Sequence, residues 1–178
     1  SKGLVGSEMC IRDRPYILID NFPDLGLIVS LRFLEWVIEN PEGVISLPTG
    51  KTPEYFIKWT HYLLKNWGNP RVEHIIRKHG FSTKDKPDLS KLIFVQIDEF
   101  YPLNPDQHNS FSNYVTKYYL DGFNIPHDNA LLINANNITL FEGEHWSKIF
   151  PGGNINLSLR HKDPSSQQEE KQQESLFL

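Results

Sequence analysis

The segment Val44–Pro53, with the sequence VISLPTGKTP, constrains the fold of this chain more than any other. Its first four residues are apolar or small and predict a buried strand. Gly50 permits a tight turn after this strand, because glycine can adopt a positive φ. Thr52 is expected to cap a helix, with Pro53 at the first helical position. The start of that helix would direct N–H groups and a partial positive charge into the turn.

This turn predicts a binding site for an anion, and a phosphate fits it best. Its residues are Thr49, Gly50, Lys51 and Thr52, of which the lysine adds a full positive charge. The alternative is an ordinary strand-to-helix turn with a solvated lysine. A P-loop also ends in Gly-Lys-Thr, but it needs a glycine five positions earlier, where this chain has Ile45. The turn is therefore not that of a nucleoside triphosphatase.

Apolar patterns of two kinds alternate along the chain. The apolar run LIFVQI at 92–97 is typical of a strand that is buried on both faces. Leucines and an isoleucine spaced by three and four residues predict a helix over 25–39. Further helices are expected from Pro53 to the break NWGNP at 66–70 and over 110–119, and further strands over 44–47 and near 131–133. Strands that alternate with helices predict an α/β fold with a parallel sheet covered on both faces.

Two adjacent carboxylates, Asp98 and Glu99, directly follow the predicted strand 92–97. Ligands of parallel sheets bind at the C-terminal ends of the strands, so this pair is expected near the turn at Gly50. Side chains alternate in direction there, and one of the two can point into the crevice. A carboxylate that is partly shielded from water can act as a general base. The alternative is that one of the acids caps the following turn.

Three segments in this order resemble the glucosamine-6-phosphate deaminases: LPTGKTP at 47–53, QIDEF at 96–100 and HNSFSNY at 108–114. The segment FNIP at 123–126, followed by Asn129 and Leu132, fits the same family. The resemblance covers roughly residues 25–135, and the same superfamily includes 6-phosphogluconolactonases. It implies a modified Rossmann-like fold of three α/β/α layers with a mostly parallel sheet, here incomplete at the C-terminus.

The resemblance also implies a reaction and roles for single residues. The family converts glucosamine 6-phosphate to fructose 6-phosphate and ammonia, without a metal or redox cofactor. Asp98 matches the aspartate that moves a proton from C2 to C1 of the sugar, and the loop 49–52 matches the one that holds the phosphate. Glu99 matches an adjoining acid with a structural role, and both Glu99 and Ser110 are candidates for lining the site.

Several departures from the family pattern keep other functions open. Lys51 stands where deaminases usually have a second glycine. Phe100 stands where they have tyrosine and lactonases tend to have arginine, which favours deaminase-like chemistry. The stretch 136–173 is longer than the usual connection, and its His145, Trp146 and Gly152 have no assigned role. The alternatives are a 6-phosphogluconolactonase or another sugar-phosphate isomerase, and a non-catalytic sugar-phosphate-binding or regulatory module.

The sequence suggests three regions. Residues 1–14 resemble translated sequencing-adapter sequence and are excluded from fold reasoning. Residues 15–160 are expected to be the N-terminal part of a sugar-phosphate deaminase or isomerase domain. Residues 161–178 are polar and lead into either a truncated helix or a disordered tail. The family's Asp-Gly-His loop, whose histidine opens the sugar ring, does not occur in this sequence. Our hypothesis is therefore an N-terminal fragment that is inactive by itself.

Composition limits the remaining possibilities. With 178 residues and 39% hydrophobic content, the chain can form one domain with a real core. The net charge of −4 and the lack of a basic run give no reason to expect nucleic acid as a partner. No apolar stretch has the length of a membrane span. The single cysteine, Cys10, is typical of a reducing, cytoplasmic setting. The family commonly forms homo-oligomers, so the intact protein is expected to allow one.

Overall fold

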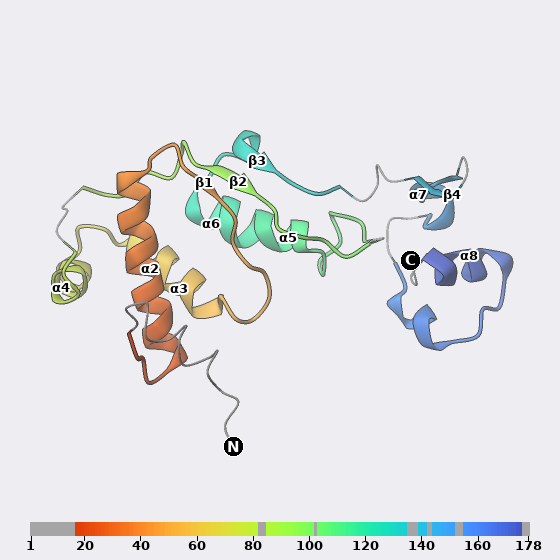
Figure 1. Cartoon of the computed structure of the whole chain (residues 1–178), viewed down its shortest axis with the longest axis horizontal. Coiled ribbons are helices and arrows are strands. Elements are labelled where there is room, and N and C mark those ends of the chain that lie inside the picture. The colour runs from red at the N-terminus through yellow and green to blue at the C-terminus, as the bar shows by residue number, and fades with distance from the viewer. Residues whose placement is uncertain are drawn as a thin grey trace, which may run out of the picture.

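The computed structural model describes residues 17–81, 85–101, 103–134, 139–141, 144–151 and 155–175. Within these ranges the chain is rich in helix and contains a three-stranded parallel sheet. Figure 1 shows α2, α3 and α4 at one end of the molecule and α7 and α8 at the other, with the parallel strands between them. The predicted α/β class is confirmed. The adapter-like leader 1–14 lies outside the described residues.

The helix α2 (Phe22–Glu39) confirms the helix predicted over 25–39. It begins after Asn21, whose side chain accepts a hydrogen bond from the N–H of Asp24 at 2.9 Å. Its apolar residues recur at helical spacing and face the core, namely Leu27, Leu31, Leu34 and Val37. Neither α2 nor any other helix in the described part of the chain is long and apolar enough to cross a membrane.

The helix α3 (Glu54–Lys65) packs closely against α2. A Cβ on Gly26 would lie 2.5 Å from the Cβ of Tyr55, so only glycine allows the two backbones to approach this far. The buried hydroxyl of Ser30 lies 2.8 Å from the carbonyl oxygen of Gly26 and 2.9 Å from that of Phe56. Thr60 donates a further hydrogen bond to the Ser30 hydroxyl at 3.1 Å. These contacts fix the first turn of α3, and with it the loop that precedes the helix.

The helix α4 (Pro70–Lys78) follows the predicted break at 66–70. Asn69 caps it by accepting a hydrogen bond from the N–H of Arg71 at 2.9 Å, and Pro70 occupies the first position. The preceding helix has already ended at Lys65, with Asn66 as its C-cap. We expected only the break, since no helix was predicted over 70–78. Val72 and Ile76 bury the inner face of α4.

The parallel sheet consists of β1 (Val44–Ile45), β2 (Ile93–Val95) and β3 (Ala130–Leu131), in this order. Both strand pairs are parallel, with Ile45 opposite Phe94 and Phe94 opposite Ala130. The strands are shorter than predicted, but each lies within or overlaps the expected segment. The parallel sheet predicted from the alternation of elements is confirmed.

The inner face of the sheet contributes to the main hydrophobic core. Phe94 is fully buried, and its ring stacks on that of Tyr119 with centroids 5.7 Å apart. Helices α2 and α3 each supply four of the other core residues. This core holds the strands and the helices in one unit, so the loops at the strand ends start from fixed positions.

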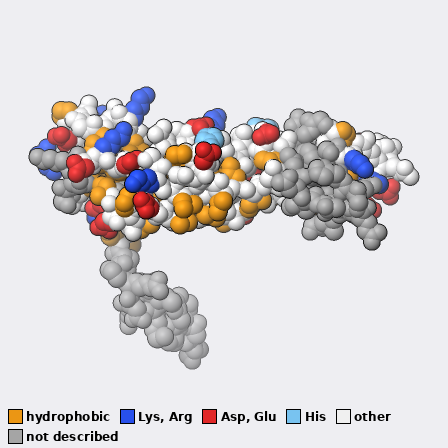
Figure 2. Space-filling model, turned by 90° about the horizontal axis from the view of Figure 1, so that it is seen from above, with side chains coloured by type: hydrophobic (Ala, Val, Ile, Leu, Met, Phe, Trp, Pro, Cys, Tyr) orange, Lys and Arg blue, Asp and Glu red, His pale blue; other side chains and the backbone are white. Residues whose placement is uncertain are grey.

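The outer face of the sheet is exposed, and the prediction that 92–97 is buried on both faces is wrong. Val44 is 61% exposed, Ile97 56% and Leu131 66%, while Phe94 is 0% exposed. The apolar run therefore reflects one buried face and one apolar but uncovered face. Figure 2 shows hydrophobic side chains at the surface along the middle of the molecule.

A continuous helical segment follows residue 110. It consists of α5 (Phe111–Val115), the π-helical turn η1 (Thr116–Leu120) and α6 (Asp121–Phe123), and extends beyond the predicted range 110–119. Within the wide turn, the N–H of Asp121 bonds to the carbonyl of Thr116, five residues earlier. Next to it, Nε2 of His61 lies 3.1 Å from the carbonyl oxygen of Tyr118.

The C-terminal part forms a second, smaller core. Its elements are β4 (Thr139–Phe141) antiparallel to β5 (Glu144–His145), α7 (Trp146–Ile149), η4 (Leu157–His161) and α8 (Gln167–Ser175). Apolar side chains in and next to α7 and η4 pack with the loop after β2, through Leu103, Ile149, Phe150, Ile155 and Leu159. Residues 167–175 of the C-terminal segment are helical. Gly152 and residues 176–178 lie outside the described residues.

Candidate functional site

The two candidate loops leave the sheet from adjacent strands at the same edge. β1 and β2 are parallel neighbours, so the loop after Leu47 and the loop after Ile97 both start at C-terminal strand ends. The hydroxyl of Ser46 donates a hydrogen bond to the carbonyl of Val95, which fastens the two strand ends to each other. The expected side-by-side origin of the loops is therefore present.

The first loop has the conformation that its glycine predicts. Gly50 has a φ of +95°, where any other residue would be strained, and no atom lies within 4 Å of the place that a Cβ would take. Among the described residues, the four N–H groups from Thr49 to Thr52 find no hydrogen-bond acceptor. Lys51 is exposed. The loop thus offers several N–H donors and one cationic side chain, which suits an anion.

The helix after this loop starts later than predicted. The N-cap of α3 is Pro53 and not Thr52, and no side chain caps the helix. The cause is a turn in which the N–H of Glu54 bonds to the carbonyl of Lys51 at 3.2 Å. The prediction that Thr52 is the N-cap is therefore wrong. Its N–H and its side chain are left at the loop, outside the helix.

The charges around the start of α3 are unevenly distributed. Glu54 forms an ion pair with Lys58 one turn later on the exposed face. The hydrogen bond from the Lys58 ammonium holds the pKa of Glu54 below its ordinary value, with a smaller contribution from the charge of Lys51. Because Glu54 already pairs with Lys58, the charge of Lys51 is not fully neutralised by this neighbour.

Two tyrosines of the helical segment 111–123 hold the loop from one side. The hydroxyl of Tyr114 donates to the carbonyl of Gly50 at 2.7 Å, and that of Tyr119 donates to the carbonyl of Pro48 at 2.5 Å. The two rings contact each other, with centroids 6.0 Å apart. Neither contact was predicted from the sequence.

The carboxylate of Asp98 has no partner among the residues that the structure describes. The residue is exposed, and its carboxylate makes no hydrogen bond or ion pair with any described residue. Only its backbone carbonyl is engaged, as the acceptor of a hydrogen bond from Nε2 of Gln96 at 2.8 Å. The backbone is therefore held while the carboxylate is available to a ligand.

The carboxylate of Glu99 is fully engaged in holding the next helix. One of its oxygens accepts hydrogen bonds from the N–H groups of Phe100 and Phe111, both at 2.9 Å. The other accepts from the N–H of Ser112 at 2.8 Å and from Nε2 of Gln96 at 3.3 Å. Glu99 thus binds N–H groups at the start of α5 that would otherwise lack a partner. Glu99 therefore positions α5.

Ser110 also serves the start of α5. As the N-cap, its hydroxyl oxygen accepts a hydrogen bond from the N–H of Asn113 at 2.9 Å. The same hydroxyl donates to the carbonyl of Pro105 at 2.6 Å. The side chain is 1% exposed. Its contacts and burial direct it to the protein interior, away from a ligand at the loop surface.

Gln96 is a further residue of this region that the sequence analysis did not single out. It is buried at the end of β2, and its amide bridges two chain segments. Its oxygen accepts a hydrogen bond from the N–H of Ile133 at 2.9 Å, and its nitrogen donates to the carbonyl of Asp98. The sequence feature that could have identified Gln96 is its position as a polar residue near the end of the apolar run 92–97.

A cavity of about 280 Å³ lies beside the first loop, where Gly50 and Lys51 meet Tyr114. Asp98 is not among the residues that line it. The two loops are instead linked through one helix, because Tyr114 of α5 holds Gly50 while Glu99 holds the start of α5. The structure thus brings together the loop residues, and sets Asp98 at the neighbouring strand end outside this cavity.

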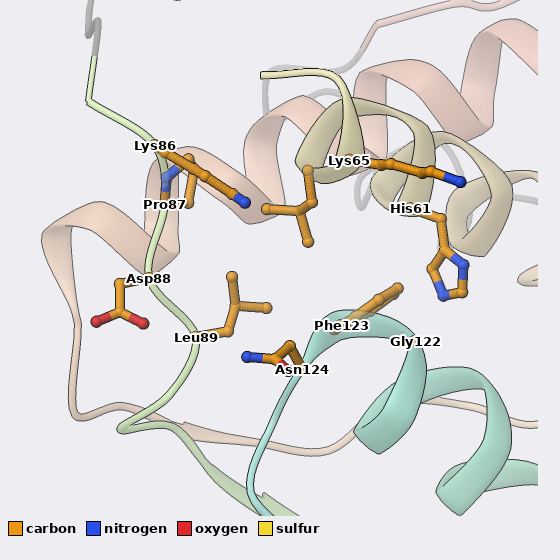
Figure 3. Close-up of a pocket in the computed structure, with 10 residues that line it drawn as sticks. His61, Lys65, Lys86, Pro87, Asp88, Leu89, Gly122, Phe123 and Asn124 are labelled. Carbon is orange, nitrogen blue, oxygen red and sulfur yellow. The ribbon is translucent and has the colours of Figure 1, made fainter. Parts of the chain in front are cut away.

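A larger cavity of about 530 Å³ lies away from all predicted site residues. In Figure 3, His61 and Lys65 come from α3, Lys86 comes from the chain that leads to β2, and Asn124 follows α6. The segment with Lys86 enters β2 at its N-terminal end, whereas ligands of parallel sheets bind at the C-terminal ends. Across the described ranges, no three His, Cys, Asp or Glu side chains are grouped as a metal site requires.

Comparisons with known proteins agree with the motif resemblance. No family model matches the sequence. A curated glucosamine-6-phosphate deaminase of Clostridium botulinum (strain Loch Maree) is 27% identical over 145 residues, covering 80% of this chain and 52% of that protein. One of Clostridium tetani (strain Massachusetts) is 24% identical over 145 residues, covering 80% of this chain and 53% of its own length. The chain thus spans about half the length of the curated relatives it matches.

A solved structure has the same fold. It is a monomeric glucosamine-6-phosphate deaminase, described as a missing link of the NagB superfamily. It superimposes with a TM-score of 0.51 at 19% identity, over 66% of this chain and 42% of that one. At this identity the likeness establishes the fold alone. The chain is therefore similar in sequence to the glucosamine-6-phosphate deaminases, as its motifs predicted, and shares the α/β fold of the solved deaminase.

Proposed function

We propose that this chain carries the phosphate-binding loop and the proton-transferring aspartate of a glucosamine-6-phosphate deaminase. The observation that supports this most is the contrast between the adjacent acids Asp98 and Glu99. The carboxylate of Glu99 is bound to three backbone N–H groups and to the side-chain amide of Gln96, whereas that of Asp98 has no described partner. The acid that matches the catalytic residue of the family is thus the one left free for a substrate.

The loop 49–52 would bind the phosphate group of the sugar. Its unpaired N–H groups can donate to phosphate oxygens, and Lys51 can supply a charge that Glu54 does not fully neutralise. Hydrogen bonds with a charged acceptor are about twice as strong as neutral ones, so a dianionic phosphate would gain more here than a sugar hydroxyl. The phosphate would then hold the other end of the sugar toward the neighbouring strand end.

Asp98 would act on the carbon atoms at that other end. Its carboxylate would accept the proton from C2 of the open-chain amino sugar and return it to C1, which converts the aldose into a ketose imine. Addition of water at C2 then releases ammonia and leaves the ketone of fructose 6-phosphate. One carboxylate serves both proton transfers because C1 and C2 are adjacent.

Titration calorimetry with glucosamine 6-phosphate tests this proposal, with glucosamine as the control ligand. We expect the phosphorylated sugar to bind and glucosamine to bind far more weakly. Lys51→Ala should weaken binding by about tenfold, since it removes a charged partner of the phosphate. Asp98→Asn should change the Kd by less than about twofold, because it leaves the loop intact. Equal and small effects of both substitutions would contradict the assigned roles.

Two further measurements separate the alternatives. Tighter binding of 6-phosphogluconate than of glucosamine 6-phosphate would favour a lactonase. We infer that the 178-residue chain by itself binds the sugar phosphate without releasing ammonia, because its sequence lacks the Asp-Gly-His loop. Clear ammonia release by this chain would contradict that part of the proposal and would support the deaminase reaction directly.

A further inference from the structure

The peptide groups of the first loop are held in a defined orientation. The carbonyl oxygens of Pro48 and Gly50 accept hydrogen bonds from Tyr119 and Tyr114, respectively. In a planar trans peptide the carbonyl of one residue and the N–H of the next point in opposite directions. The N–H groups of Thr49 and Lys51 therefore face away from the tyrosines.

We infer that Tyr114 and Tyr119 are positioning residues that aim these two N–H groups at the substrate phosphate. This inference rests on the proposed function of the loop. The tyrosines bind only the carbonyl side of the loop and leave its N–H groups without described partners. If the carbonyls were free, the peptide groups of the loop could rotate and turn the N–H groups of Thr49 and Lys51 away from the ligand. The two tyrosines prevent this rotation, so the loop has its binding conformation before the ligand arrives.

The π-helical turn explains how both hydroxyls reach the same loop. In an α-helix each residue advances by about 100°, so residues five apart lie about 140° from each other around the axis. Tyr114 and Tyr119 are five residues apart, and η1 covers Thr116–Leu120 between and beyond them. The wider turn brings residues at this spacing onto one face, which agrees with the contact between their rings.

Both hydroxyls remain donors over a wide pH range. Burial raises the pKa of Tyr119, which is 0% exposed. Burial also raises the pKa of Tyr114, with smaller contributions from Tyr118 and Glu54. Neither tyrosine ionises near neutral pH, so each keeps the proton that its hydrogen bond to the loop requires.

Amide NMR of the ¹⁵N-labelled chain, titrated with inorganic phosphate, tests the inference. In the unmodified chain we expect phosphate to shift the amides of Thr49 and Lys51. Tyr114→Phe removes one tether and keeps the ring, and should weaken phosphate binding by about five- to tenfold. It should also shift the Lys51 amide before any ligand is added. Tyr62→Phe, two turns along α3 from the loop, is the control and should leave the Kd unchanged.

The outcomes separate this inference from the proposed function. Unchanged phosphate binding by Tyr114→Phe, with the loop amides still shifting, would overturn the positioning role and leave the phosphate site in place. No phosphate response of Thr49 and Lys51 in the unmodified chain would overturn both. Weaker binding by Tyr114→Phe, with an unchanged unfolding midpoint, would support the inference even if glucosamine 6-phosphate proved not to be the substrate.

Discussion

Replacing Glu99 by glutamine should destabilise the protein although the two side chains have the same shape. The carboxylate of Glu99 accepts two hydrogen bonds on each oxygen, three from backbone N–H groups and one from the side-chain amide of Gln96. Glutamine keeps one oxygen but replaces the other by an NH₂ group. That group would face the N–H of Ser112, so donor would meet donor. The loss of one charged hydrogen bond, with an N–H left unpaired, costs about 1.5–3 kcal/mol.

Urea unfolding of the Glu99→Gln and Asp98→Asn variants measures the effect. We expect Glu99→Gln to lower the unfolding free energy by this amount with an unchanged slope m. The matched control is Asp98→Asn at the next position, which should change it by less than about 0.5 kcal/mol because the Asp98 carboxylate has no described partner. Equal losses for the two variants, or none for Glu99→Gln, would refute the assignment of Glu99 to the start of α5.

Three further predictions concern packing. Gly26→Ala should cost about 1–3 kcal/mol in urea unfolding, because its Cβ would lie 2.5 Å from that of Tyr55 and push α2 from α3; no loss would contradict the close helix contact. Phe94→Ala should cost about 3–5 kcal/mol, since the ring is fully buried; a value below about 1 kcal/mol would place Phe94 outside the core. Leu131→Lys, on the exposed sheet face, should alter stability by less than about 0.5 kcal/mol and reduce self-association in sedimentation velocity. A large loss of stability would mean that this face is covered.

The sequence was sufficient for the class of the fold and for the first loop. Alternating periodicities predicted the parallel sheet, and Gly50 predicted the positive φ that the loop requires. Such features depend on residues close in sequence, which is why they can be inferred locally. The register of α3 was not predictable in the same way. Tyr55 is 38% exposed and Phe56 only 7%, because the tight contact with Gly26 sets which side of α3 faces α2.

Other features depend on contacts that no local pattern contains. The run 92–97 has apolar side chains on both faces. Its composition therefore could not predict that only one face is covered. Tyr114 and Tyr119 are not neighbours on an α-helix, so the pair that holds the loop could only be found with the π-helical turn in view. The prediction of an N-cap at Thr52 was wrong for a related reason, because a turn between Lys51 and Glu54 shifts the start of α3 to a later residue.

In the proposed site, one sugar phosphate extends from the loop at Gly50 to the carboxylate of Asp98. Chemical-shift mapping of the ¹⁵N-labelled chain with glucosamine 6-phosphate tests it most directly. We expect the amides of Thr49–Thr52 and of Asp98 to shift together and to follow one binding curve. Shifts at the loop with an unaffected Asp98, or two curves with different midpoints, would contradict it.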